Sequence, residues 1–282
     1  MKQYHDLLQD ILDNGIESED RTGVGTLSVF GRMMRFDLCE GFPILTTKKI
    51  HFKSVLHELI WLVSGSTNTK YLDDNGVRIW REWSDSKGNL GPVYGHQLRN
   101  LNATPFDNNN LLKNSKYYKP YFKNGYDQLA ETIKNIKDNP YSRRHVVSLW
   151  NSSDLKYQAL PCCHGTVIQF YVRDKKISCS MYQRSCDTFL GLGFNISSYA
   201  ILTHMIAQVC GLDVGELIIT TGDTHIYKNH IEQVKLQLTR EEYPLPTLWL
   251  NPEIKDIDDF TYEDIKLIGY KSHPSIKADV AV

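Results

Sequence analysis

The sequence predicts an α/β (α+β) protein of one domain, in which helices pack against layers of mixed β-sheet. Apolar runs of strand length alternate with longer segments whose apolar residues recur at helical spacing, from one end of the 282 residues to the other. No shift in composition marks a domain boundary, and 41% hydrophobic residues suffice for one large core. We therefore expect residues 1–282 to form a single domain.

Five helices are predicted. The first carries Tyr4, Leu8 and Ile11 on one face and stops at Gly15. The last begins with Asp223 as a plausible N-cap, because a short acidic side chain there can accept a backbone N–H. The other three are expected at residues 52–64, 126–136 and 194–210.

Six strands are predicted from short apolar or alternating runs, and one segment has no periodicity. Residues 100–125 are rich in asparagine, lysine and tyrosine, which predicts a surface insertion. The strands are expected at residues 26–30, 33–38, 145–150, 166–172, 177–182 and 217–221.

Bulk properties exclude several classes of protein. The formal net charge of −1 makes nucleic acid an unlikely partner, because there is no basic excess to release counterions. No apolar run approaches the roughly 18 to 20 residues that span a bilayer, and the N-terminus lacks the apolar core of a signal peptide. Six cysteines in a chain of this length do not form a disulfide framework. We expect a cytoplasmic protein with reduced thiols, no membrane contact and no metal site.

Residues 160–199 combine a candidate nucleophile, a candidate anion-binding site and polar side chains that could recognise a ligand by hydrogen bonds. Cys163 and His164 stand directly before a predicted strand, and Gln183, Arg184 and Ser185 end the next one. A free thiol has a pKa of about 8.5, so it needs a nearby cation to ionise near pH 7. Arg184 could supply that charge and also hold an anionic substrate.

Some residues further along have two readings from the pattern alone. Glu58 lies beside the apolar stripe of its helix, so it is either an edge residue in water or a buried acid with a raised pKa. Trp80 and Trp83 are either core aromatics or a flat surface for a planar ligand. Tyr94 lies in a Gly-Pro-Val-Tyr-Gly loop, where two glycines let the backbone approach a ligand.

The remaining basic candidates also have an ordinary structural interpretation. Arg21 stands at the tip of an Asp-Arg-Thr-Gly turn, where arginine is usually just solvated. Arg143 and Arg144 are adjacent at the head of a predicted strand and could be surface charges. His225 in isolation suits a structural histidine better than a functional one.

These residues together resemble the thymidylate synthase family over nearly the whole chain. The resemblance implies that family's fold, a dimer formed through a sheet face, and methylation of dUMP to dTMP by 5,10-methylenetetrahydrofolate, giving dihydrofolate. It is carried by DRTGVGT (20–26), GFPILTTKK (41–49), HELIW (57–61), IWREW (79–83), GPVYG (91–95), SRR (142–144), residues 160–199, GDTHIYKNHI (222–231) and a C-terminal AV.

The resemblance also implies roles for individual residues, with no metal. Cys163 would add to C6 of dUMP, and the other catalytic residues would be Glu58, Tyr94, His164, Asn195 and Asp187. The substrate-binding residues would be Arg21, Gln183, Arg184, Ser185, Asn195, His225 and Tyr227, with Arg143 and Arg144 reaching the partner's site in a homodimer. The folate would be held by Lys48, His51, Ile79, Trp80, Trp83, Asp187, Gly191, Phe194, Ala281 and Val282.

Four positions depart from the usual pattern of the family. Cys162 stands where a proline commonly precedes the nucleophile, and Gly193 replaces a proline, which we expect to loosen the loop that carries Asn195. Arg81 replaces an aspartate, and Leu98 replaces a tryptophan.

Three rival functions can be compared with the sequence. A dUMP hydroxymethylase on the same fold would use water in place of hydride, and a cytosine-specific version would carry aspartate at position 195. A thiol hydrolase would pair Cys163 with His164, but adjacent residues on a strand point apart. An RNA-binding protein does not fit the charge balance.

Overall fold

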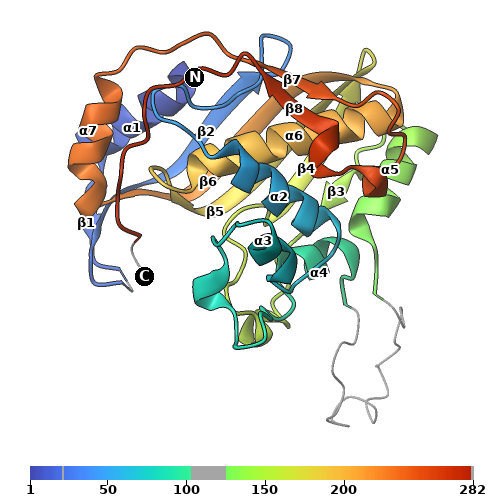
Figure 1. Ribbon diagram of the computed structural model, residues 1–282, viewed down its shortest axis with the longest axis horizontal. Helices are drawn as coiled ribbons and strands as arrows, with labels where there is room; N and C mark the ends of the chain where they lie inside the picture. The colour runs from blue at the N-terminus through green and yellow to red at the C-terminus, as the bar shows by residue number, and fades with distance from the viewer. Residues whose placement is uncertain (21, 103–124, 281–282) are drawn as a thin grey trace.

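The computed structural model describes residues 1–20, 22–102 and 125–280, and a six-stranded sheet lies at its centre (Figure 1). The strand order is β1-β2-β6-β5-β4-β3; the β5–β6 pair is parallel, and the other pairs are antiparallel. The strands are β1 (Ile16–Ser18), β2 (Thr26–Asp37), β3 (Val146–Val147), β4 (Val167–Arg173), β5 (Lys176–Asp187) and β6 (Asp213–Tyr227). A separate hairpin-like pair joins β7 (Thr247–Leu250) to β8 (Ile265–Ile268). The mixed α/β class predicted from the sequence is confirmed.

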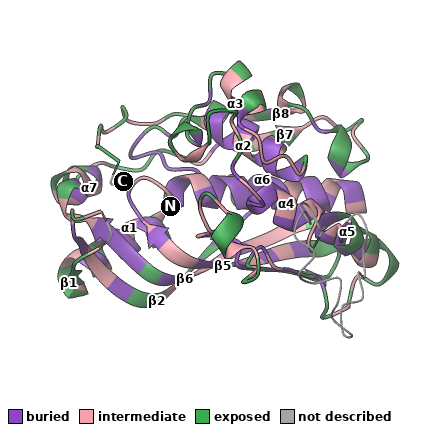
Figure 2. Cartoon of the chain, turned by 90° about the horizontal axis from the view of Figure 1, so that it is seen from below, coloured by how far each residue is buried: buried purple, intermediate pink, exposed green. Residues whose placement is uncertain are grey.

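Helices cover one side of the sheet (Figure 2). The longest, α6 (Leu192–Cys210), connects parallel strands β5 and β6, and it is buried nearly all round because its sequence is apolar on every face. The other helices are α1 (Lys2–Asn14), α2 (Phe52–Val63), α3 (Lys70–Asp74), α4 (Tyr94–Arg99), α5 (Gln128–Asp138) and α7 (Ile231–Leu238). Single 3₁₀ turns occupy Arg81–Trp83, Leu155–Tyr157, Lys228–His230, Ile257–Asp259 and Tyr262–Asp264.

The register of the sheet separates a buried face from an open one. One row across the strands consists of Met34, Ile219, Met181, Ile168 and Val147, all of them buried. Side chains alternate between faces along a strand, so the neighbouring row must face the other way.

That neighbouring row is apolar yet exposed. Met33, Thr220, Tyr182 and Val167 pair across four strands, and Met33, Tyr182 and Val167 are 59%, 38% and 46% exposed. No described helix covers this face (Figure 2). An apolar sheet face of this kind is typical of an association surface.

Two predictions about elements were wrong. Asp223 does not cap a helix, because residues 223–227 continue β6 and pair with Thr26–Phe30 of β2. The β-branched residues Thr224 and Ile226 favour that strand, and α7 begins only at Ile231. The strand expected over 145–150 shrinks to Val146–Val147, since only those two residues pair with β4.

Other predicted elements differ only in length. The two strands expected over 26–38 are one continuous strand, β2, and the strand expected over 217–221 is the centre of the longer β6. The helix expected at 126 begins two residues later, where Asp127 accepts the N–H of Ala130 at 3.0 Å. Most of the predicted insertion, residues 103–124, lies outside the described residues.

Candidate active site

Cys163 is held by a tyrosine hydroxyl from another part of the chain. Tyr94 opens α4, directly after the Gly91-Pro92-Val93 loop, and its ring is buried. The N–H of Cys163 donates to the Tyr94 hydroxyl at 2.8 Å, and the Cys163 Sγ lies 3.3 Å from the same oxygen. The Tyr94 hydroxyl therefore fixes both the backbone and the thiol of Cys163.

The surroundings of the Cys163 thiol act on its pKa in opposite directions. Burial raises its pKa, while the Tyr94 hydrogen bond and the Arg184 charge act in the opposite direction with smaller effect. The charge of Arg184 therefore favours the thiolate, as the sequence suggested, but it does not outweigh burial in the free protein. Arg184 still makes ionisation easier than burial alone would allow.

Cys162 is a poor rival for the role of nucleophile. Its side chain is buried, and burial raises its pKa to about 12. Its backbone carbonyl has a different task, since it accepts the Nε–H of Arg184 at 2.8 Å.

Arg184 braces the loop that carries the nucleophile. Its Nε and Nη2 donate to the carbonyls of Cys162 and Pro161, and its guanidinium carbon lies 5.2 Å from the ring centroid of Trp150. A guanidinium has five N–H donors, more than these two bonds use. The remaining donors suit an anion such as a phosphate.

Glu58 is a partly buried acid, which settles the ambiguity left by the sequence. Its Oε1 accepts the indole N–H of Trp80 at 2.7 Å. Burial raises its pKa to about 7, against the opposing effect of the Trp80 hydrogen bond. Such a carboxyl can gain or lose a proton near neutrality.

Trp80 belongs to the core as well as to the site. It is 6% exposed, and its ring centroid lies 5.6 Å from those of Trp61 and Tyr94 and 5.9 Å from that of Trp83. Trp83 is half-buried, and the stacking of a folate on these rings stays a prediction.

His164 is a neutral histidine that contacts tyrosines. Its Nδ1 lies 3.0 Å from the Tyr199 hydroxyl, and its ring packs against Tyr94 at 4.6 Å. Burial lowers its pKa to about 4. Cys163 and His164 lie in the loop before β4 and not on a strand, so our geometric reason against a hydrolase was wrong. Their observed hydrogen bonds nevertheless go to two different tyrosines.

Gln183 and Asn195 form a buried amide pair. The Nε2 of Gln183 donates to Asn195 Oδ1 at 3.1 Å and to the Ser185 carbonyl at 3.2 Å. The Oε1 of Gln183 is buried and has no hydrogen-bond partner among the described residues. An unpartnered buried acceptor is costly, so this atom suits a ligand that brings an N–H donor.

Gly193 does not loosen a loop, contrary to our expectation. It lies in the first turn of α6, two residues before Asn195, and it is buried. A Cβ at this position would come within 2.7 Å of Leu45 Cδ1 and 3.1 Å of Ile50 Cδ1. The missing side chain thus allows close packing against Leu45.

Asp187 and Lys48 meet around one turn. The Oδ1 of Asp187 accepts the N–H groups of Phe189 and Leu190 at 3.0 and 3.1 Å. Lys48 is only 5% exposed, and its ammonium donates to the Phe189 carbonyl. Burial lowers the pKa of Lys48 to about 7, with Asp187 acting against the shift.

The end of β6 supplies two further predicted site residues. His225 is buried, and its Nδ1 lies 2.8 Å from Asp223 Oδ1. Its ring packs edge-on against Tyr227 at 5.1 Å. The hydrogen bond with His225 lowers the pKa of Asp223.

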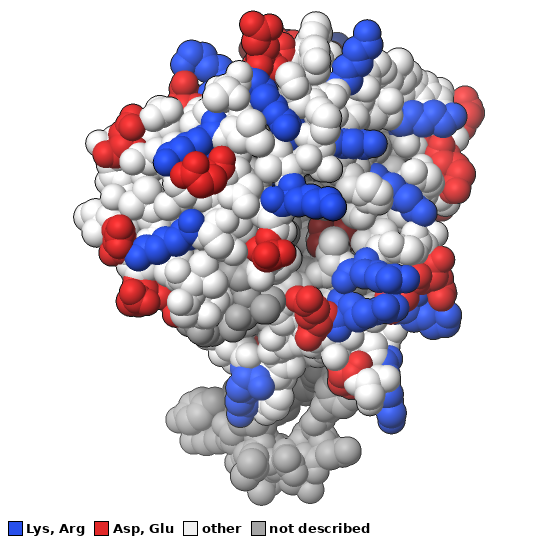
Figure 3. Space-filling view, turned by 60° about the vertical axis from the view of Figure 1, so that its left-hand side comes forward, with Lys and Arg blue, Asp and Glu red and all other residues white. Residues whose placement is uncertain are grey.

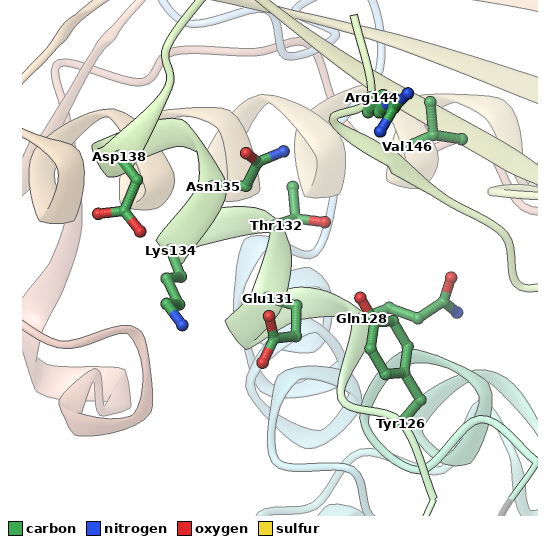
Figure 4. Close-up of a pocket in the computed structure, with 9 residues that line it drawn as sticks. All are labelled: Tyr126, Gln128, Glu131, Thr132, Lys134, Asn135, Asp138, Arg144 and Val146. Atoms are coloured by element: carbon green, nitrogen blue, oxygen red, sulfur yellow. The ribbon is translucent and has the colours of Figure 1, made fainter. Parts of the chain in front are cut away.

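Arg143 and Arg144 are exposed. Arg144 lines a groove of about 270 Å³ together with residues of α5, among them Glu131 and Asn135 (Figure 4). None of the nine lining residues contributes to the Cys163 and Tyr94 cluster.

The other predicted folate residues are spread over exposed and half-buried positions. His51 and Ile79 are exposed, and Gly191 and Phe194 are half-buried at the start of α6. His51 Nδ1 lies 2.7 Å from Ser54 Oγ. Arg21, Ala281 and Val282 lie outside the described residues.

Sequence reasoning missed two contributors to this site. Tyr199, which contacts His164, counted only as an inward-facing residue of its helix, and Trp150 counted only as the end of a strand. A buried tyrosine usually finds a partner for its hydroxyl, and that polar group could have marked Tyr199.

Among residues 1–20, 22–102 and 125–280, no group of three or more His, Cys, Asp or Glu residues could hold a metal ion. No helix in the same ranges is long and apolar enough to cross a membrane. Positive and negative side chains are interspersed over the face shown in Figure 3. This mixture agrees with the formal net charge of −1.

A comparison with known protein families shows the family to which the chain belongs. The family model described as thymidylate synthase matches residues 2–282, essentially the full chain. The matched range includes the thiol, the buried acid and the amide pair, so the chain belongs to the thymidylate synthase family.

Proposed function

We propose that this protein methylates dUMP to dTMP with 5,10-methylenetetrahydrofolate. One observation carries the proposal: Cys163 is bonded to the Tyr94 hydroxyl, and the Tyr94 ring packs against Trp80, whose indole N–H donates to Glu58. Glu58 has a pKa of about 7, and the amide pair of Gln183 and Asn195 supplies groups that can recognise a base. Addition to a uracil ring requires a nucleophile, a group that donates and accepts protons, and polar groups that bind the uracil.

The amide pair fits the edge of uracil. Uracil offers an N3–H donor between two carbonyl acceptors. The Oε1 of Gln183 is an unpartnered acceptor, and the Nδ2 of Asn195 is a donor. Cytosine carries no proton on N3 and an amine at C4, so the same pair suits it less well.

The chain's own groups account for the first chemical step. Cys163 passes its proton to the ionised carboxylate of Glu58 and its sulfur adds to C6, while the electrons of the C5–C6 bond shift toward O4 and the proton is delivered there. The resulting enol makes C5 a carbon nucleophile. The phosphate of dUMP would bind Arg184, Ser185 and Arg21 of the same chain. The ribose would lie near His225 and Tyr227. Phosphate binding at Arg184 places the base near the thiol, because this side chain also braces the Cys162 carbonyl.

Proton transfers fall to Glu58 and Tyr94. A carboxyl with a pKa of about 7, such as Glu58, can both donate and accept a proton near neutrality, and O4 is the proposed site of the transfer. His164 stays neutral and orients the ring of Tyr94 rather than moving a proton.

Asp187, at the 187–191 turn, suits a pterin. A carboxylate can accept two N–H donors, and the half-buried ring of Trp83 is a second candidate contact for the folate. When bound, methylenetetrahydrofolate supplies the one-carbon unit and the hydride. The chain's task is then to hold it and exclude water.

A homodimer through the open sheet face would complete the site. The row of Met33, Tyr182 and Val167 supports this, because a large apolar face favours association. Arg143 and Arg144 are exposed, and the groove that Arg144 lines contains no residue of the Cys163 and Tyr94 cluster, so both guanidinium groups are accessible to a partner's phosphate.

Two departures that could favour a hydroxymethylase lose their force. Arg81 does not project a free charge, since its Nη2 lies 3.0 Å from Asp73. Gly193 is packed against Leu45 within α6. Neither departure therefore favours water over hydride.

Release of tritium from C5 of labelled dUMP tests the proposed chemistry. Substitution at C5 must expel this hydrogen, and it should do so only when the folate and Cys163 are both present. We expect release with wild-type protein and none with Cys163→Ser. Undiminished release by the variant would refute the assignment of the nucleophile.

A further inference from the structure

The turn at residues 187–191 joins β5 to α6 and links two ligand-facing side chains. Asp187 is the last residue of β5, and Asn195 lies in the first turn of α6. The N–H groups of Phe194 and Asn195 donate to the Gly191 carbonyl at 3.0 and 3.2 Å. The position of this turn therefore sets where both side chains lie.

Side chains from distant segments bind two carbonyls of the turn. The Tyr4 hydroxyl, from α1, donates to the Thr188 carbonyl at 2.9 Å. The Lys48 ammonium, from the segment before α2, donates to the Phe189 carbonyl and lies 3.6 Å from the centroid of that residue's ring. Tyr4 and Lys48 are both buried, so water does not readily replace either bond.

The opposite side of the turn is bound to the sheet. The N–H and the hydroxyl of Thr188 both donate to the His225 carbonyl, at 3.0 and 2.8 Å. The turn is thus fastened to β6 on one side and to Tyr4 and Lys48 on the other. Loss of either side chain donor would leave a buried carbonyl unpartnered, and the backbone would shift to find another donor.

We propose that Tyr4 and Lys48 are positioning residues: they hold the 187–191 turn in place, and this keeps the Asp187 carboxylate where it can accept hydrogen bonds from the folate. The inference rests on the proposed function. It also gives Lys48 a task different from the direct folate contact that the family resemblance implies.

The effect should fall on the folate more than on dUMP. The Oδ1 of Asp187 is bonded to Phe189 and Leu190, so it moves with the turn. Asn195 is held in addition by Gln183, which belongs to β5 and does not depend on the turn.

Tyr4→Phe tests the proposal, because it removes one hydroxyl and keeps the ring. Tyr71→Phe is the matched control: it removes a hydroxyl that bonds His57 Nδ1 at 2.9 Å, outside the turn. Loss of one hydrogen bond predicts a rise in the KM for methylenetetrahydrofolate of roughly 3- to 10-fold for Tyr4→Phe. The dissociation constant of dUMP should stay within about 2-fold of wild type, and the control should change neither.

Lys48→Met separates positioning from direct contact. Methionine keeps most of the length and removes the donor. We compare methylenetetrahydrofolate with its counterpart lacking the glutamate. A positioning role predicts the same rise in KM for both, whereas a contact between the ammonium and the glutamate carboxylates predicts a rise only for the first. The second pattern would overturn the assignment of Lys48.

Hydrogen exchange of the free protein supplies a readout that does not depend on activity. Amides of residues 188–195 should exchange faster in Tyr4→Phe and in Lys48→Met than in wild type or Tyr71→Phe. Unchanged exchange in both variants would overturn the proposal even if the enzyme makes dTMP. Faster exchange without dTMP formation by wild type would instead count against the proposed function.

Discussion

At the scale of single residues, the environment of each group decides its chemistry more than its type does. Cys162 and Cys163 are neighbours in the chain, yet only Cys163 contacts Tyr94 and lies at the site. The sequence predicted Cys163, Glu58 and Asn195 through family motifs. It could not predict that burial outweighs Arg184 at the thiol, because that balance depends on the packed surroundings of Cys163.

The two cysteines should therefore differ sharply when each is replaced by serine. Cys163→Ser removes the nucleophile, and we expect a loss of turnover of at least about 10³-fold. Cys162→Ser leaves the Arg184 contact with its backbone carbonyl intact and should keep activity within about 10-fold. Steady-state rates of the two variants give the comparison, and equal losses would leave the thiol unassigned.

Glu58 should make stability depend on pH. Its pKa is raised from 4.5 to about 7 in the folded protein, so its stabilising contribution is complete below about pH 4.5 and is lost as the pH rises through 7. The shift corresponds to a loss of up to about 3 kcal/mol. Urea unfolding at pH 5 and pH 8 should show a smaller decline for Glu58→Gln than for wild type. Identical declines would contradict the raised pKa.

At the scale of elements, long periodic segments were predictable and short ones were not. The apolar helix over 194–210 and the alternating strand over 166–172 correspond to α6 and β4 within two residues. The helix predicted from Asp223 was wrong because this residue resembles an N-cap locally. Pairing of residues 223–227 with β2, about 200 residues earlier, makes them a strand. The local signals conflict, since Thr224 and Ile226 favour a strand, and only the long-range pairing decides between them.

The N-cap of α5 offers a test at this scale. Asp127 accepts the N–H of Ala130 at 3.0 Å and pairs with Arg99 at 2.9 Å. Asp127→Ala should lower the free energy of unfolding by about 1–2 kcal/mol, because both the cap and the ion pair are lost. Asp127→Asn keeps the cap and should lose less. Urea midpoints that are equal for the two variants would refute this account of the cap.

At the scale of the whole molecule, the open sheet face and the exposed Arg143 and Arg144 lead to the same expectation of a shared site. The apolar residues of that face were visible in the sequence, but which of them face outward depended on the register of β2, β4, β5 and β6. Single-chain periodicity cannot show what a face packs against.

Hybrid dimers test this sharing. A protein with Arg143→Ala and Arg144→Ala should be inactive, as should Cys163→Ser, and mixing them should restore activity. One site in each hybrid would combine an intact thiol with intact arginines from its partner. With random subunit exchange, half of the dimers are hybrids, and each hybrid has one intact site out of two. The mixture should therefore recover about a quarter of the activity of the same amount of wild-type protein. Absence of recovery after verified subunit exchange would refute the shared site.

The mass of the product formed from dUMP and methylenetetrahydrofolate tests the central claim most directly. The packed Gly193, the paired Arg81 and the buried wall around Trp80 argue for hydride in preference to water. We predict dTMP, with one dihydrofolate formed for each nucleotide. A product heavier than dTMP by one oxygen, formed without dihydrofolate, would show that the protein is a hydroxymethylase.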